Sequence, residues 1–134
     1  MSTTDRLSSS RAAMRAGWVF TGIALLFLAM DITLKLLRFP QVAESLTQLG
    51  WPAQSGFALG LLLLVCTLLY AVPKTSVLGA VLMTGYLGGA IATHARLGDP
   101  LFSHTLFGVY VGVVMWLGLW LRDPALRALV PWRR

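Results

Sequence analysis

The chain has 134 residues, a formal net charge of +6 and a mean hydropathy of +0.74. Hydrophobic residues make up 57% of it and charged residues only 12%, too few to cover the surface of a fold this size in water, which excludes a soluble enzyme. Most basic residues flank apolar segments, as membrane anchors do, so we expect the lipid bilayer as a partner and no nucleic acid.

Residues 1–15 are polar and rich in Ser and Thr at their start, and we expect a flexible cytoplasmic N-terminus. Four apolar runs follow, each close to the roughly 20 residues that a helix needs to cross hydrocarbon. A cleaved signal peptide is the alternative for the first run, but Phe27 interrupts the small-residue pattern of a cleavage site ending at Ala29. Because backbone groups in lipid must pair internally, the runs should be helices. The sequence predicts an all-α integral membrane four-helix bundle over residues 16–121, with spans at about 16–37, 52–72, 76–97 and 101–121.

The links between the predicted spans set their directions. Two of them, 73–75 and 98–100, are so short that they join antiparallel neighbours, which predicts an up-down-up-down bundle. The longer first link places Val42, Leu46 and Leu49 at helical spacing with polar residues opposite. This pattern predicts a short interfacial helix between spans 1 and 2.

The Lys and Arg residues are divided unevenly between the two sides of the predicted bundle. Cytoplasmic segments carry the excess of basic residues, so both termini, which lie on the richer side, are expected in the cytoplasm. In the basic tail, residues 122–134, Asp123 followed by Pro124 is typical of a helix start and predicts a short C-terminal helix. The basic residues on this side are Arg6, Arg11, Arg15, Lys74, Arg122, Arg127, Arg133 and Arg134.

Small residues are the usual contacts between helices in lipid, because they let backbones approach closely. G-x-x-x-G pairs occur in the second, third and fourth predicted spans, and the third also carries a stripe of small residues. We expect these glycines to pack helices within one bundle, while a homodimer interface is the alternative. The predicted helix-packing glycines are Gly56, Gly60, Gly85, Gly88, Gly89, Gly108 and Gly112.

Ionisable side chains within apolar spans are costly, which makes them candidates for function. Asp31 lies towards the outer end of the first span, and Lys35 follows one turn later on the same face. The pair is either a structural ion pair or part of a ligand site. An antiparallel bundle brings polar residues from the end of the third span and the start of the fourth to the same level. The candidate cluster is Asp31, Lys35, Tyr86, His94, Arg96, Asp99 and His104.

A histidine beside a carboxylate could protonate and deprotonate a quinone carbonyl, because histidine titrates near neutrality and the acid can pass the proton on. Quinone is therefore the cofactor class that stays open, and the catalytic residues are unknown. His94 and His104 alone are too few for a metal centre, and no haem-attachment motif occurs, so we expect neither metal nor haem. A hydrogen-bonded structural role is the alternative for each histidine. The single cysteine, Cys66, excludes an oxidoreductase built on cysteine pairs.

Several runs of the sequence form a recognisable combination: LLYAVPKT at 68–75, GYLGGA at 85–90, Thr93-His94 with Arg96, GDP at 98–100 and WLGL at 116–119. Together they resemble the DoxX-like family of small bacterial membrane proteins. The resemblance covers roughly residues 16–131 and implies a four-helix protein of the bacterial inner membrane. Four residues of the candidate cluster lie in these family-like stretches, with no established role: Tyr86, His94, Arg96 and Asp99.

The resemblance implies an association with membrane redox systems and does not imply a particular reaction. Relatives in the wider DoxX group are associated with membrane redox systems, including a thiosulfate:quinone oxidoreductase and an oxidative-stress complex, and most DoxX-like members have no assigned activity. Many relatives carry a glutamate in the second span, where this chain has Leu63. The implied role is an accessory subunit, or a small-ligand or quinone-associated component, working with membrane redox partner proteins. The alternatives are a stand-alone quinone or lipophilic-ligand enzyme and a small dimeric transporter.

Overall fold

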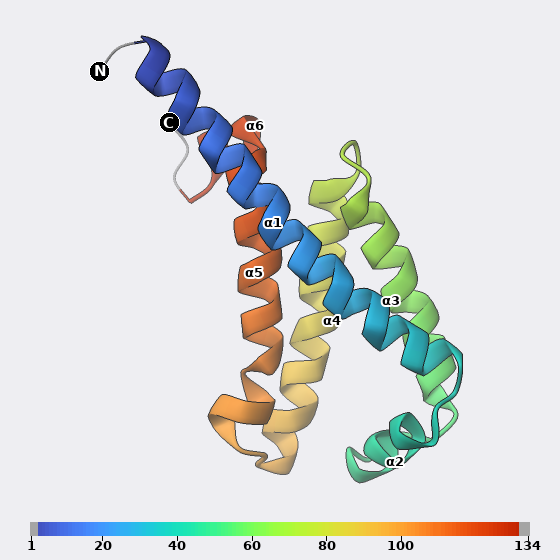
Figure 1. The fold of residues 1–134 in the computed structure, drawn as a ribbon. Helices are drawn as coiled ribbons and strands as arrows, with labels where there is room; N and C mark the ends of the chain where they lie inside the picture. Colours follow the sequence, from blue (N-terminus) through green and yellow to red (C-terminus); the bar gives the residue numbers. More distant parts are fainter. Residues whose placement is uncertain (1–2, 132–134) are drawn as a thin grey trace.

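The computed structural model describes residues 3–131, so the predictions for residues 1–2 and 132–134 lie outside the described residues. Within 3–131 every regular element is helical and no strand occurs, which confirms the all-α class. Figure 1 shows the elements in chain order: α1 (Thr3–Leu36), α2 (Pro40–Gln48), α3 (Ser55–Ala71), α4 (Ser76–Leu97), the π-helical turn η1 (Leu101–Thr105), α5 (Phe107–Arg122) and α6 (Pro124–Leu129).

Three helical segments are long and apolar enough to cross a membrane: Ser10–Leu36, Ser76–Leu97 and Leu101–Arg122. The remaining apolar helix, α3, is shorter than the predicted second span, with 17 residues. It begins late because residues 52–54 lie in a turn, closed by the Ser55 N–H donating to the Pro52 carbonyl at 3.0 Å. It ends before Val72 because Pro73 disfavours a helical conformation in the preceding residue.

The four apolar helices share one core (Figure 1). Helix α1 packs against α3 and α5, and α4 packs against the same two helices. Large apolar side chains such as Val19 and Leu26 remain exposed on the outside, as expected where hydrocarbon replaces water. The most deeply buried side chains come from all four helices and include Leu28, Leu63, Tyr70, Met83, Met115 and Leu119.

Glycines occupy several of the closest contacts between helices. Gly60 of α3 lies against Lys35 and Leu36 of α1, where a side chain would collide with the Lys35 Cβ. Gly108 of α5 approaches the Leu87 carbonyl of α4 in the same way. Of the other predicted packing glycines, Gly56 and Gly112 also have side-chain neighbours from other helices.

Three predicted packing glycines differ from this pattern. Among the described residues, Gly85, Gly88 and Gly89 have no neighbour within 4 Å of the place where a side chain would begin. The tightest contact was not predicted at all. It is formed by Gly79 of α4, which lies directly on the backbone of Tyr70 in α3. Sequence spacing alone therefore does not tell a packing glycine from one beside open space.

The N-terminal segment is helical in the structure from Thr3 onwards, and the flexibility of residues 1–15 stays a prediction. Helix α1 starts at Thr3 and is continuous for 34 residues. No Pro or Gly interrupts it before Gly17, and Ala and Arg residues in this stretch favour helix. Figure 1 shows this end of α1 extending beyond the rest of the bundle.

The two predicted short helices are present as α2 and α6. The Asp123 carboxylate caps α6 by accepting hydrogen bonds from the Ala125 and Leu126 N–H groups at 2.9 and 3.2 Å. The predicted fourth span differs at its start, because residues 101–105 form a wide π-helical turn. Its defining bond runs from the Leu106 N–H to the Leu101 carbonyl, at 2.8 Å.

Candidate functional site

A cavity of about 470 Å³ lies between α1, α3, α4 and α5, at the end of the bundle where α2 and η1 are found. Its volume is within the range of roughly 300–1,000 Å³ that is typical of small-molecule sites. Most of the wall is apolar, with contributions from all four helices, among them Leu28, Leu63, Leu87, Ile91, Phe107 and Val111.

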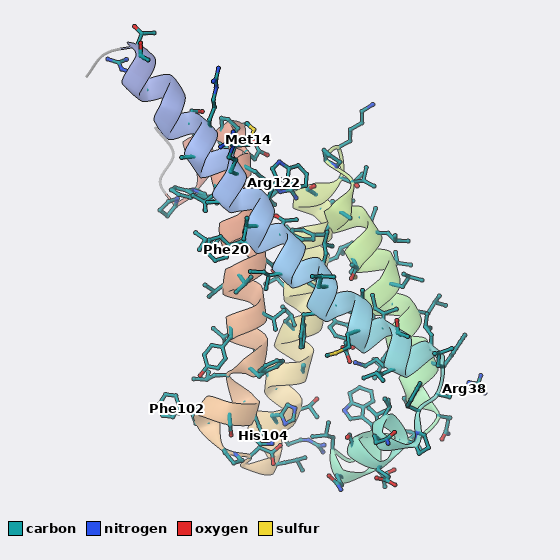
Figure 2. The ribbon with its side chains drawn as sticks, viewed as in Figure 1. Met14, Phe20, Arg38, Phe102, His104 and Arg122 are labelled. Carbon is teal, nitrogen blue, oxygen red and sulfur yellow. The ribbon has the colours of Figure 1, made fainter. Side chains whose placement is uncertain are left out.

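Five of the seven candidate cluster residues line this cavity: Asp31, Lys35, Tyr86, His94 and His104. They come from α1, from α4 and from the η1 turn, so segments far apart in the sequence converge on one space. Figure 2 shows His104 on η1, close to the end of α4. The structure thus places most of the predicted polar cluster around a single apolar cavity.

Asp31 and Lys35 form a hydrogen-bonded ion pair one helical turn apart on α1. The Lys35 side chain is only 14% exposed and that of Asp31 31% exposed. A buried ammonium group without a counter-ion would be expensive, so the Asp31 carboxylate offsets the cost of burying Lys35. The pair is thus both a structural feature of α1 and a charged part of the cavity wall.

His94 is held by Asp99, which lies behind it and outside the cavity lining. The Nδ1 atom of His94 is 2.6 Å from Oδ2 of Asp99. Gly98 makes this contact possible, because its φ of 70° turns the chain left-handed at the end of α4. The Asp99 N–H then donates to the His94 carbonyl at 3.2 Å, which fixes the acid beside the ring. The Nε2 atom is left as the ring nitrogen that a cavity ligand can use.

His104 lies beside His94 on the exposed rim of the cavity. The two ring centroids are 6.0 Å apart, with the rings inclined by 61°. The Nδ1 atom of His104 is 2.8 Å from the Ser103 hydroxyl. Both imidazoles therefore have one nitrogen engaged by the protein.

Arg96 does not line the cavity. Its Nη2 group donates to the Leu49 carbonyl at 2.8 Å, and so connects α4 to the segment after α2. The Trp51 indole N–H donates to the Thr93 hydroxyl at 3.4 Å in the same region. These hydrogen bonds hold the α2 segment across one side of the cavity.

Sequence reasoning missed the part that α2 plays in the site. Leu46, Leu49 and Trp51 all line the cavity, although their apolar spacing was interpreted as a face lying on the membrane. Gly85 and Gly89 line it too, which explains why they have no helix neighbour. The apolar period from Val42 to Leu49 was the one available signal, and it does not distinguish lipid from a cavity.

A second cluster of polar side chains lies at the opposite end of the bundle, around Arg122, the last residue of α5, which Figure 2 labels beside α1. Its guanidinium carbon is 4.4 Å from the centre of the Trp18 ring, and Nη2 donates to the Ser76 hydroxyl at 3.3 Å. The buried Tyr70 hydroxyl donates to the Met115 carbonyl at 2.8 Å. These contacts join all four apolar helices and have a structural explanation.

Metal ligands do not gather in the cavity. Within residues 3–131, no group of three or more His, Cys, Asp or Glu side chains is placed to hold a metal ion. The two imidazoles, the Tyr86 hydroxyl and the Asp31 carboxylate instead suit hydrogen bonding and proton exchange with an organic ligand.

Three long apolar helices and an apolar cavity with a polar end define an all-helical membrane protein. The sequence profile of the DoxX-like family matches residues 19–118, and the chain belongs to this family. The matched range includes all seven residues of the candidate cluster. Comparisons with curated proteins and with solved structures found no match.

Proposed function

We propose that the protein crosses the bacterial inner membrane four times, with both termini in the cytoplasm, and that its cavity binds a lipophilic ligand of the quinone class. In this proposal it is an accessory component of a membrane redox system. One observation carries the proposal: Asp31, Lys35, Tyr86, His94 and His104 line a single, mostly apolar cavity.

The composition and length of α3 support a fourth crossing. Its 17 residues include no charged side chain. At 1.5 Å per residue it is about 26 Å long, slightly less than the roughly 30 Å of hydrocarbon in a typical bilayer. With α3 as a crossing, the basic residues divide as the positive-inside rule requires for cytoplasmic termini.

The residues of the cavity fit a quinone. Such a ligand needs apolar walls for its ring and hydrogen-bonding groups for its oxygens. Phe27 and Phe107 supply apolar walls. The Tyr86 hydroxyl and the imidazoles of His94 and His104 supply hydrogen-bonding groups. A bound quinone would contribute the capacity to carry electrons and protons.

The His94–Asp99 pair favours a stand-alone enzyme as the second candidate. Asp99 orients the imidazole, so His94 can exchange a proton with a ligand oxygen. Both side chains are about a quarter exposed, which gives the proton a route to solvent. Quinone reduction or oxidation by the isolated protein with a small electron donor or acceptor would favour this candidate over an accessory role.

Trp51 provides a direct test of quinone binding, because its indole lines the cavity. Titrating the detergent-solubilised protein with a short-tailed benzoquinone should quench tryptophan fluorescence in a saturable way. Trp51→Phe should remove the saturable component. Trp120→Phe is the matched control, because Trp120 lies at the other end of α5 and donates to the Val130 carbonyl. Quenching that rises linearly and is equal in both variants would contradict the proposal.

A further inference from the structure

Four polar atoms, all in side chains that line the cavity, have no hydrogen-bond partner among the described residues. One is the Oδ2 atom of Asp31, since Lys35 contacts only Oδ1. The others are the Tyr86 hydroxyl and the Nε2 atoms of His94 and His104, whose Nδ1 atoms contact Asp99 and Ser103. Polar atoms in an apolar space cost free energy unless a water or a ligand pairs with them, so these atoms define what a ligand must offer.

Two of these atoms are acceptors. The Asp31 carboxylate, paired with Lys35, has only acceptor capacity. In the neutral His94 ring, the contact with the Asp99 carboxylate places the proton on Nδ1, which leaves Nε2 as an acceptor. The Tyr86 hydroxyl can donate, and so can the Lys35 ammonium, which has N–H groups beyond the one bonded to Asp31. The protein thus supplies donors of its own, whereas Asp31 Oδ2 and His94 Nε2 need a donor from the ligand.

A quinone has only carbonyl acceptors to offer, so it would leave the free Asp31 oxygen unpaired or face it with a second acceptor. A hydroquinone or another phenol has the same ring and tail but carries O–H donors. One such hydroxyl can donate to Asp31 or to His94 Nε2, while a ligand oxygen accepts from Tyr86.

We propose that the cavity selects hydroxyl-bearing aromatic lipids, such as hydroquinones and phenols, over the corresponding quinones. This inference rests on the proposed function, because it specifies which form of the quinone-class ligand the same cavity prefers. The preference comes from Asp31, with His94 as the second acceptor.

A series of three ligands tests the preference without changing the protein. A short-tailed benzoquinone, its hydroquinone and the dimethyl ether of that hydroquinone share one ring and tail, but only the hydroquinone can donate. Their binding to detergent-solubilised protein is measured by anaerobic equilibrium dialysis. The hydroquinone should bind about tenfold more tightly than the other two, as one extra hydrogen bond to a charged group can provide.

The possible results separate the two proposals. Equal binding of all three ligands, or tighter binding of the quinone, would overturn the preference and leave the quinone-class site intact. If none of the three binds saturably, the proposed function itself fails and the preference fails with it.

Variants then locate the preference. Asp31→Asn should lower the ratio of hydroquinone to quinone affinity to less than about threefold, because the amide can also donate to a carbonyl. Glu44→Gln is the matched control and should leave the ratio unchanged, since Glu44 is exposed on α2 and forms no ion pair with the described residues.

Asp31→Asn also leaves Lys35 without its counter-ion, which threatens folding. The double variant Asp31→Asn with Lys35→Met removes both charges and provides a second protein for the same measurement. An unchanged tenfold preference in whichever of these variants elutes as a folded protein would overturn the role of Asp31.

Discussion

The Nδ1 atom of His94 lies 2.6 Å from Oδ2 of Asp99, five residues later in the chain. The contact joins the last turn of α4 to the loop before η1, and Gly98 makes it by adopting a left-handed conformation. Asp99 thus acts on the cavity through His94 without lining it. This relationship gives the first prediction.

Asp99→Asn should weaken ligand binding about tenfold, because an amide can donate as well as accept and no longer fixes the proton on Nδ1. The free energy of unfolding should change by less than about 1 kcal/mol, since the two side chains are 24% and 29% exposed. Equilibrium dialysis and thermal unfolding in detergent measure the two effects.

Asp123→Asn is the control for this variant, because Asn caps a helix about as well as Asp and α6 lies far from the cavity. It should change neither quantity. A large loss of stability in Asp99→Asn with unchanged affinity would instead assign the pair a structural role.

Two glycines of α4 should respond in opposite ways to the same substitution. Gly79→Ala should lower the free energy of unfolding by about 1–3 kcal/mol, because the methyl group meets the Tyr70 backbone, which cannot move as a side chain can. Gly88→Ala should leave stability unchanged or raise it by up to about 1 kcal/mol, since the site is open and Ala favours helix.

Thermal unfolding monitored by size-exclusion chromatography compares the stability of the two variants. Equal stability would contradict the close contact between Gly79 and the Tyr70 backbone. The same experiment bears on the homodimer alternative. If Gly88→Ala converts a dimer to a monomer, the open face of α4 is an interface between two copies of the chain.

Arg96→Gln should speed ligand release by about three- to tenfold with little change in melting temperature. The variant loses the hydrogen bond to the Leu49 carbonyl, one of the contacts holding the α2 segment across the cavity. Stopped-flow fluorescence of Trp51 measures the dissociation rate. Lys74→Gln, an exposed change between α3 and α4, is the control. An unchanged rate in Arg96→Gln would show that ligands do not leave past α2.

The proposed topology predicts different labelling of two loops. In a Cys66→Ala background, Thr47→Cys on α2 should react with a membrane-impermeant maleimide. The reagent is added to the outside of spheroplasts whose inner membrane is intact. Lys74→Cys should react only after the membrane is opened. Both positions are exposed in the structure, so burial does not prevent labelling. The reverse pattern would place both termini outside the cytoplasm.

The helices were predictable from sequence because apolar runs of this length have few alternatives in lipid. Gathering of the polar cluster at one end was predictable as well, since antiparallel links bring His94 and His104 to neighbouring helix ends. The helical period predicts that Arg96 points away from the face of α4 that carries His94. It lies two residues, or about 200° of rotation, beyond His94, so both cannot face one cavity.

Other features depend on contacts that no local pattern contains. The apolar face of α2 suits a lipid surface and a cavity wall equally well, and only the Arg96–Leu49 and Trp51–Thr93 hydrogen bonds decide between them. A glycine in the sequence likewise does not show whether another helix packs against it or whether the space beside it is empty. Gly79 and Gly85 belong to one helix and show both outcomes.

The uninterrupted course of α1 has a mechanical consequence. Thr3 and Asp31 belong to one continuous helix, and the 28 steps between them span about 42 Å at 1.5 Å per residue. A stiff helix of this length would pivot as one body about its contacts with α3 and α5. A force that tilts the protruding end would therefore displace the Asp31–Lys35 side of the cavity in the opposite direction.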